Sequence, residues 1–260
     1  MADGVVAAPD GVPIAYEVHG AGPPALVLVH GWSCDRTYWR GQLEPLSRDF
    51  RVVAIDLAGH GESGLEREAW TIEAFGADVA TVVGELELDR VILIGHSMGG
   101  DVVLEAARRL RGRVAALIWL DTYSHLGSPR TADQVEAILD PFRADLAGAT
   151  RELVRGLFPA DAEESLVEWV AADMAAAPRA VALGALESSF TYGRTVTTPL
   201  QELGLPVVAI NPESPSTDVS SMERYGVEVV LMSHVGHFLM LEDPQRFNRL
   251  LSDVVKRFAS

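Results

Sequence analysis

Residues 91–100 read Val91-Ile92-Leu93-Ile94-Gly95-His96-Ser97-Met98-Gly99-Gly100, and this stretch decides the fold. The four apolar residues at its start predict a strand that is buried on both faces. The segment 102–107 is rich in helix formers and contains no proline, which predicts a helix. Gly95 and Gly99 are needed because a Cβ at either position would collide with the neighbouring strand or helix. The stretch therefore predicts a strand, a sharp turn with Ser97 at its tip, and a helix.

Apolar runs of strand length recur on both sides of this stretch. Residues 4–8 and 13–19 are separated by Pro9-Asp10-Gly11, which indicates a hairpin. Further strands are expected at 25–29, 51–56, 114–120, 205–210 and 227–232, with helices at about 36–48, 71–87 and 244–258. Strands that alternate with helices predict an α/β fold with a doubly wound, mostly parallel sheet. Ligands of such sheets bind at the carboxyl ends of the strands.

The alternation stops between residues 123 and 197. This segment is rich in alanine and helical in character, and it is broken by Pro129, Pro141, Pro159 and Pro178. Because it interrupts the alternation on the side where a ligand would bind, we expect a helical cap rather than an independent domain. The predicted organisation is a core of residues 1–122 and 198–260 that carries a cap of residues 123–197.

The aromatic residues that the cap supplies include Phe142, Phe158, Trp169, Phe190 and Tyr192. At helical spacing such residues mostly form the core of the cap itself. A pocket beneath the cap should still be mainly apolar. The sequence therefore predicts a small, apolar molecule as the substrate.

The charge and the cysteine content exclude several classes of protein. The formal net charge is −16, which argues against nucleic acid and anionic membrane surfaces as partners. Cys34 is the only cysteine and is expected to be a small buried filler. The first residues lack the features of an export signal, and no apolar run is long enough to span a membrane, so a cytoplasmic protein is expected. Nothing in the sequence specifies an oligomeric state.

No cofactor and no metal are expected. The sequence contains no metal-ligand spacing, no glycine loop suited to phosphate and no dinucleotide fingerprint. The chemistry is therefore expected to come from the side chains and the backbone of the chain.

Ser97 needs a general base, because a hydroxyl at its ordinary pKa is a poor nucleophile. Of the seven histidines, His237 lies between the last strand and the last helix, at the end of the sheet from which it can reach Ser97. His234 is its nearest competitor. The other histidines near glycines are expected to serve turns or to point away from the site: His30, His60 and His96. The sequence therefore predicts that His237 is the base.

An attack on a carbonyl carbon also needs donors for the developing oxyanion. The backbone N–H of Met98, directly after Ser97, is one candidate. The N–H of Trp32, in the loop after the strand that ends at Val29, is the natural second. Both donors belong to the backbone, so an aromatic packing role for the Trp32 ring is compatible with this prediction.

Four segments resemble the α/β-hydrolase family. The resemblance covers about residues 4–122 and 198–260, and it also extends to the chain order of serine and histidine. Within that family the chain is similar to small esterases, lactonases and C–C hydrolases with a helical cap. Dehalogenases and epoxide hydrolases have Asp as the nucleophile, so Ser97 argues against both. The segments are 30–32 (His-Gly-Trp), 56–63 (Asp-Leu-Ala-Gly-His-Gly-Glu-Ser), 95–100 (Gly-His-Ser-Met-Gly-Gly) and 236–244 (Gly-His-Phe-Leu-Met-Leu-Glu-Asp-Pro).

The acid of the expected triad is where this sequence departs from the family pattern. Most members carry it after the strand equivalent to residues 207–210, and that position here is Pro215. Some members place the acid after the preceding strand, which corresponds to Asp121. Many relatives also have a structural Asp there. We favour Asp121 over Asp218 and Glu213.

The resemblance implies a cofactor-free serine hydrolase that cleaves a small uncharged carboxylic ester or lactone through an acyl-enzyme on Ser97. One alternative is a C–C bond hydrolase of a diketone that uses the same residues. Another is a ligand receptor with very slow turnover on the same fold.

Overall fold

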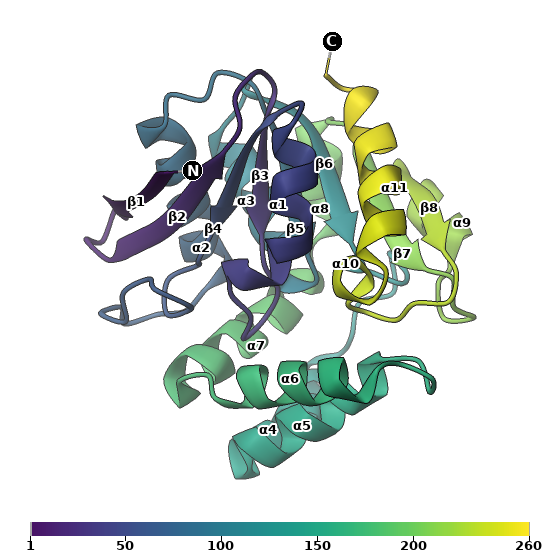
Figure 1. Cartoon of the computed structure of the whole chain (residues 1–260). Coiled ribbons are helices and arrows are strands. Elements are labelled where there is room, and N and C mark those ends of the chain that lie inside the picture. The colour runs from purple at the N-terminus through teal and green to yellow at the C-terminus, as the bar shows by residue number, and fades with distance from the viewer. Residues whose placement is uncertain (1, 260) are drawn as a thin grey trace.

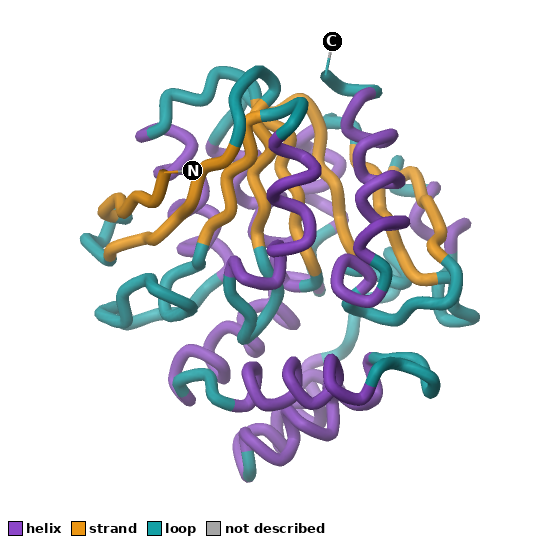
Figure 2. The backbone as a smooth tube through the Cα atoms, in the orientation of Figure 1, coloured by secondary structure: helices purple, strands orange, loops and turns teal. Residues whose placement is uncertain are grey.

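The computed structural model describes residues 2–259, which form an eight-stranded sheet with helices around it (Figures 1 and 2). The strand order is β1-β2-β4-β3-β5-β6-β7-β8. The pairs β1–β2 and β2–β4 are antiparallel and all other pairs are parallel. The predicted α/β fold with a mostly parallel sheet is confirmed. The strands are β1 (Ala2–Ala7), β2 (Pro13–His19), β3 (Ala25–Val29), β4 (Arg51–Ile55), β5 (Val91–His96), β6 (Val114–Leu120), β7 (Val207–Pro212) and β8 (Val227–Met232).

Helices cover both faces of the sheet (Figure 1). One face carries α1 (Arg40–Ser47) and α11 (Pro244–Lys256), which contact each other; a 3₁₀ turn, η1 (Arg36–Trp39), precedes α1. The other face carries α2 (Ile72–Glu85), α3 (Met98–Arg109) and α8 (Thr197–Leu203). Thr71 caps α2 by accepting a hydrogen bond from the Ala74 N–H, which satisfies one free donor of the first turn.

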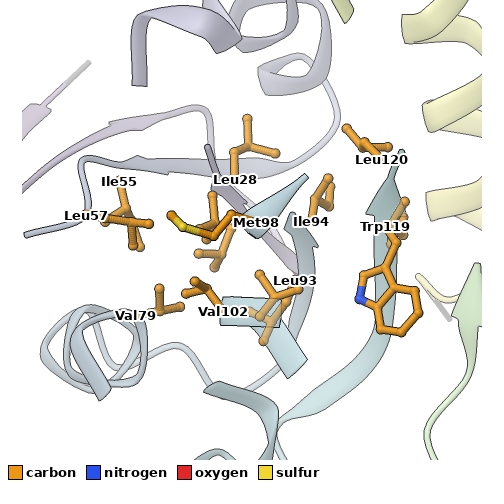
Figure 3. Packing of buried hydrophobic residues seen from close by; sticks show 14 of the residues in the cluster. Leu28, Ile55, Leu57, Val79, Leu93, Ile94, Met98, Val102, Trp119 and Leu120 are labelled. Carbon is orange, nitrogen blue, oxygen red and sulfur yellow. The ribbon is translucent and has the colours of Figure 1, made fainter. Parts of the chain in front are cut away.

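The hydrophobic core lies between the sheet and these helices. Every residue of β3 and β5 is buried, as their unbroken apolar runs predict. Figure 3 shows Val79 of α2 beside Val102 of α3, among the buried side chains that also include Leu93 of β5. Burying a side chain of this size contributes about 1.5–3 kcal/mol each. The core therefore holds β5 and α3, and the turn between them, in a fixed place.

Four helices are inserted between β6 and α8 and lie beyond the carboxyl ends of the strands (Figure 1). Thr131 begins the first of them with a capping box, in which its side chain and that of Gln134 each accept the other residue's backbone N–H. Of the prolines expected to break this segment, Pro141 instead lies inside a helix, which ends three residues later. The helices are α4 (Ala132–Ala144), α5 (Leu146–Leu157), α6 (Glu164–Ala175) and α7 (Arg179–Gly193).

Two short helices were not anticipated from the sequence: α9 (Val219–Glu223) and α10 (Leu239–Glu242). The predicted boundary between residues 197 and 198 falls after the first residue of α8, which packs on α3. Among residues 2–259, no helix has both the length and the apolar character needed to cross a bilayer.

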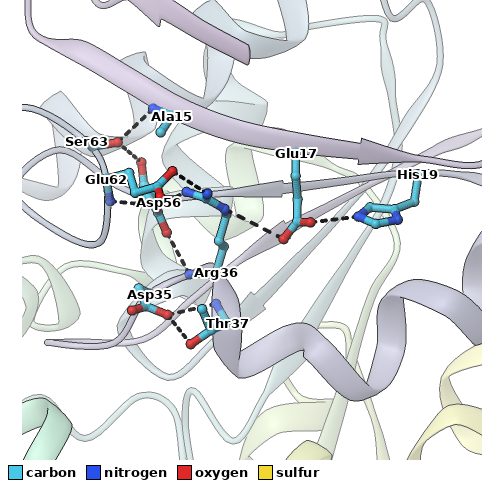
Figure 4. A network of polar contacts seen from close by, with 9 residues as sticks. All are labelled: Ala15, Glu17, His19, Asp35, Arg36, Thr37, Asp56, Glu62 and Ser63. Atoms are coloured by element: carbon cyan, nitrogen blue, oxygen red, sulfur yellow. Dashed lines mark hydrogen bonds and ion pairs between the residues drawn. The ribbon is translucent and has the colours of Figure 1, made fainter. Parts of the chain in front are cut away.

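Asp56 organises the loop that follows β4 (Figure 4). Its carboxylate accepts hydrogen bonds from the backbone N–H groups of Arg36 (2.7 Å) and Glu62 (2.9 Å), and it forms an ion pair with the Arg36 guanidinium. Ser63 Oγ donates to the Asp56 carbonyl (2.7 Å) and accepts from the Ala15 N–H (2.8 Å). The loop 56–63 is one of the four segments that resemble the hydrolase family. Its hydrogen bonds join the end of β4 to β2 and to η1.

Candidate active site

Ser97 sits at the tip of the sharp turn between β5 and α3. Its backbone has φ 52° and ψ −122°, which is rare for a residue with a side chain. A Cβ on Gly95 would lie 2.2 Å from the carbonyl oxygen of Gly99, and a Cβ on Gly99 would lie 2.5 Å from the carbonyl oxygen of Val29. The two glycines therefore let α3 pack against β5 and β3 while Ser97 is held in a strained conformation.

His237 and Asp121 are in direct contact. The distance between His237 Nδ1 and Asp121 Oδ2 is 2.7 Å. Asp121 follows β6 with φ 43°, and its N–H donates to the carbonyl of Ile210 in β7 (3.1 Å). His237 follows β8, and its N–H donates to the carbonyl of Leu157 at the end of α5 (2.9 Å). Both residues are therefore fixed through their backbones, and His237 is held in part by an inserted helix.

The other two candidate acids have different surroundings. Asp218 is exposed and caps α9, where its side chain accepts from the Ser221 N–H (3.0 Å) and Ser220 Oγ (2.7 Å). The hydrogen bond from Ser220 lowers the pKa of Asp218. Glu213 is also exposed, although it lines the rim of the cavity described next. Of the three candidates, Asp121 is the one that contacts the imidazole of His237.

A cavity of about 760 Å³ lies between the carboxyl ends of the strands and the inserted helices, and Ser97, His237 and Asp121 all line it. Within the part of the chain that the structure describes, no hydrogen bond of 3.5 Å or less joins Ser97 Oγ to His237. Such contacts are often long in the absence of substrate. The inserted segment contributes several large apolar residues to the wall, among them Phe158, Met174, Leu186 and Phe190.

The remaining three aromatic residues of the inserted helices pack away from the cavity wall. The Phe142 ring meets the Trp32 ring edge-on, with centroids 5.5 Å apart. The Trp169 ring lies 4.9 Å from the Tyr38 ring. Tyr192 donates its hydroxyl to Glu105 (3.3 Å). These residues join the inserted helices to the sheet domain.

The loop after β3 passes close to Ser97. A Cβ on Gly31 would lie 2.9 Å from His96 Nδ1 and 3.2 Å from Ser97 Cβ, so glycine allows this approach without a shift of either side chain. The next residue, Trp32, lines the cavity and is anchored through its ring N–H to the Ala182 carbonyl (2.7 Å). Across residues 2–259 the Trp32 backbone N–H has no hydrogen-bond acceptor. Met98 is the first residue of α3, and the N–H of a first helical residue has no acceptor within the helix. Two amides are therefore available beside the serine.

His96 does not point away from the site, so that expectation is wrong. Its ring packs against the His237 ring, with centroids 4.6 Å apart, and its Nε2–H donates to the backbone carbonyl of His237 (2.9 Å). Burial and the neighbouring His237 hold the pKa of His96 well below its usual range. The ring is therefore neutral at pH 7 and bears its proton on Nε2.

Of the remaining histidines, His30 and His60 lie in turns, whereas His125 lines the cavity. His30 donates through Nδ1 to the Gly31 carbonyl (2.8 Å) and accepts from the Leu57 N–H (3.0 Å). Burial lowers the pKa of His30 to about 4 and that of His60 to about 3, so both are neutral. His234 is exposed and does not line the cavity. Of the two histidines that compete for the role of base, only His237 lines the cavity.

Sequence reasoning missed a buried acid in the cavity wall, Asp101. Tyr123 donates its hydroxyl to Asp101 Oδ1, and Ser189 Oγ donates to Asp101 Oδ2 (3.0 Å). Burial raises the pKa of Asp101 to about 7. The signal in the sequence was its spacing: a residue four positions after Ser97 shares one face of the helix with it.

Cys34 also lines the cavity but is buried, and its thiol donates to the Trp32 carbonyl (3.4 Å). Burial raises the pKa of this thiol well above its usual value, which keeps it protonated and unreactive. Within residues 2–259, no three His, Cys, Asp or Glu side chains are grouped so that they could hold a metal ion.

The alpha/beta hydrolase family model matches residues 26–250, so the chain belongs to this family and is a hydrolase of the alpha/beta class. A thermophilic esterase from Thermogutta terrifontis has a similar structure, with a TM-score of 0.85 and 26% sequence identity over 100% of both chains. The matched range and the similar structure both include the inserted helices.

Curated relatives match over a shorter stretch. A non-heme haloperoxidase from Rhodococcus erythropolis is 39% identical over 115 residues, which cover 44% of this chain and 42% of that protein. An uncharacterized protein from Mycobacterium tuberculosis is 35% identical over 104 residues, which cover 40% of this chain and 30% of that protein. The chain therefore spans less than half the length of these relatives.

Proposed function

We propose that this protein is a serine hydrolase that cleaves a small, uncharged carboxylic ester or lactone through an acyl-enzyme on Ser97. The observation that carries the proposal is the 2.7 Å contact between His237 and Asp121, on the wall of the same cavity as the strained Ser97. A nucleophile, a base and an acid that orients the base are the three parts that acyl transfer needs.

In the proposed mechanism His237 Nε2 takes the proton of Ser97 Oγ as the oxygen attacks the carbonyl carbon. Asp121 accepts a hydrogen bond from His237 Nδ1, which fixes the tautomer and stabilises the imidazolium that forms. The N–H groups of Trp32 and Met98 donate to the oxyanion, assisted by the positive end of the α3 dipole. His237 then protonates the leaving oxygen and activates a water molecule, which releases the acyl group and frees Ser97.

The cavity supports a small organic substrate, and part of its wall is apolar. Its volume of about 760 Å³ lies within the range of sites that enclose small organic molecules, about 300–1,000 Å³. Phe158, Leu186 and Phe190 provide apolar surface in the cavity that Ser97 and His237 also line. The similar structure from Thermogutta terrifontis is that of an esterase, which favours ester hydrolysis for this chain as well.

The test is hydrolysis of p-nitrophenyl acetate and butyrate by the wild type and by Ser97→Ala. We expect turnover of the wild type in the usual range of about 1–1,000 per second, and a loss of at least about a thousand-fold in the variant. Ser124→Ala is the matched control, because Ser124 also lines the cavity but lies outside the turn. Unchanged activity in Ser97→Ala would refute the proposal, and wild-type turnover below about 0.01 per second on every ester tested would favour a receptor.

A further series separates esters from lactones. Acyl chains of graded length and lactones of graded ring size are compared by kcat/KM. Because several large apolar side chains line the cavity, kcat/KM should rise with chain length until the cavity is filled and then fall. A preference for charged acyl groups would contradict the proposed substrate class.

A further inference from the structure

Three polar side chains of the cavity wall are hydrogen-bonded to one another near Ser97: Asp101, Tyr123 and Ser189. Asp101 lies one helical turn beyond Ser97 on α3, Tyr123 follows β6, and Ser189 belongs to the inserted helix α7. Asp101 is 3% exposed, whereas Tyr123 and Ser189 are half-buried. All three residues line the cavity, and Asp101 is the most deeply buried of them.

The hydrogen-bond pattern fixes the direction of both hydroxyl groups. The pKa of Asp101 is about 7, so above this pH its carboxylate is ionised and only accepts hydrogen bonds. Tyr123 then donates its single hydroxyl proton to Asp101 Oδ1, and Ser189 donates its proton to Oδ2 (3.0 Å). Neither hydroxyl keeps a proton for a ligand. Each hydroxyl oxygen keeps lone pairs that can accept a hydrogen bond from a ligand. Hydrogen bonds to an ionised carboxylate are stronger than those between neutral groups, so both protons stay directed at Asp101.

Tyr123 has little freedom to rearrange. Its backbone carbonyl accepts a hydrogen bond from Asn211 Nδ2 (2.7 Å), and its ring lies 5.4 Å from the Trp119 ring. Burial and the adjacent Asp101 raise the pKa of Tyr123 well above its usual value, so its hydroxyl stays protonated. The group is therefore prepared in advance, and a ligand would not have to order it.

We propose that Tyr123 and Ser189 form a subsite that accepts a hydrogen bond from a hydroxyl or amide N–H of the substrate, and that Asp101 is the positioning residue that makes both of them acceptors. The inference rests on the proposed function, since it specifies the substrate class of the same cavity. The preferred substrates are esters or lactones that carry a neutral hydrogen-bond donor, in preference to fully apolar ones or to ethers.

The test is a binding measurement that needs no turnover. Three phenylacetones that carry a hydroxyl, a methoxy or a methyl group on the ring, each as meta and para isomers, are titrated into the wild-type protein by calorimetry at about pH 8. These ketones contain no ester bond, so they bind without being hydrolysed. We expect the better hydroxyl isomer to bind about 10-fold more tightly than its methoxy and methyl counterparts, as one net hydrogen bond provides.

Asp101→Asn tests the role of the carboxylate. An amide has one accepting oxygen and one donating NH₂ group, so one of the two hydroxyls must turn its proton toward the cavity. The preference should then shift about 10-fold or more toward the methoxy ligand. Glu105→Gln makes the same change one turn further along α3, where Glu105 accepts the Tyr192 hydroxyl outside the cavity wall, and should leave the preference unchanged.

Tyr123→Phe and Ser189→Ala remove one acceptor each and should weaken binding of the hydroxyl ligand without affecting the methyl ligand. A purely structural role for Asp101 would weaken all three ligands alike. Equal binding of all three by the wild type, or an unchanged preference in a folded Asp101→Asn variant, overturns the subsite. If the wild type does not hydrolyse p-nitrophenyl esters, the proposed function fails. The subsite is tested by ligand binding alone, so its failure can be distinguished from failure of the proposed function.

Discussion

Asp121 Oδ2 and His237 Nδ1 lie 2.7 Å apart, although 116 residues separate them in the sequence. The contact follows from the sheet topology. Asp121 comes directly after β6 and His237 follows β8, and the strand order β6-β7-β8 brings the carboxyl ends of these strands to one edge. The bond from the Asp121 N–H to β7 completes the connection.

The first prediction concerns the identity of the acid. Asp121→Asn should lower kcat for p-nitrophenyl butyrate by about a thousand-fold or more, because the amide favours the wrong tautomer of His237. Asp218→Asn and Glu213→Gln should retain activity within about twofold, since neither side chain contacts the imidazole. Near-normal kcat in Asp121→Asn, together with a large loss of kcat in Asp218→Asn or Glu213→Gln, would show that Asp121 is not the acid of the triad.

The second prediction concerns His96, which donates to the backbone carbonyl of His237 and packs against its ring. His96→Ala should lower kcat about tenfold with little change in KM, because the base loses about 1.4 kcal/mol of positioning energy. His96→Gln retains an N–H donor and should recover most of the loss. A drop in thermal stability without a change in kcat would instead assign a purely structural role to His96.

The third prediction concerns the tight turn. Gly95→Ala should destabilise the protein by at least about 3 kcal/mol in urea unfolding, because its Cβ would meet the backbone oxygen of Gly99 at 2.2 Å. Gly84→Ala is the control: Gly84 lies in helix α2, and its Cβ would meet nothing within 4 Å. That variant should gain about 0.5–1 kcal/mol. Equal stability of the two variants would contradict the packing described for the turn.

The fourth prediction is a pH dependence of stability that arises from Asp101. Burial raises its pKa to about 7 in the folded protein, above the value of 3.8 that it has when exposed. Between these values the folded state binds more protons than the unfolded state, so its contribution to stability is present at low pH and is lost as the pH rises toward 7. Each pH unit in this range costs up to about 1.4 kcal/mol.

The side chain introduced by Asp101→Asn cannot titrate, so the unfolding free energy of this variant should lack the part of the pH dependence that Asp101 causes. The groups that face Asp101 from neighbouring elements, Tyr123 and Tyr192, have raised pKa values and do not titrate in this range. The difference in unfolding free energy between the wild type and Asp101→Asn should therefore fall steadily from about pH 4 to pH 7. A difference that is flat over this range would show that Asp101 is not a buried acid.

The fold was largely predictable because its strands are short apolar runs bounded by glycine and proline. The runs at 25–29 and 91–94 could only be buried strands in an alternating α/β pattern. The short helix α10 (Leu239–Glu242) escaped prediction, because four residues provide too little periodicity to recognise. Pro141 was interpreted as a break, yet it lies inside α4, where packing of the helix overrides its intrinsic preference.

The candidate site was predictable where the chemistry depends on sequence spacing. Ser97 is defined by its flanking glycines, and His237 by its position after the last strand. Asp121 could only be ranked above Asp218 and Glu213, since the choice depends on which loop reaches the imidazole. The environment of His96 and the bonds to Asp101 are long-range contacts, and no local pattern in the sequence specifies them.

The central claim is that Ser97 is the nucleophile, activated by His237. The most direct measurement is mass spectrometry of peptides from the folded protein after reaction with a fluorophosphonate, with His237→Ala as the comparison. We predict one covalent adduct on the peptide that contains Ser97, formed in parallel with loss of esterase activity and at least about a hundred-fold slower in His237→Ala. An adduct on any other residue, or loss of activity without labelling of Ser97, would contradict the account.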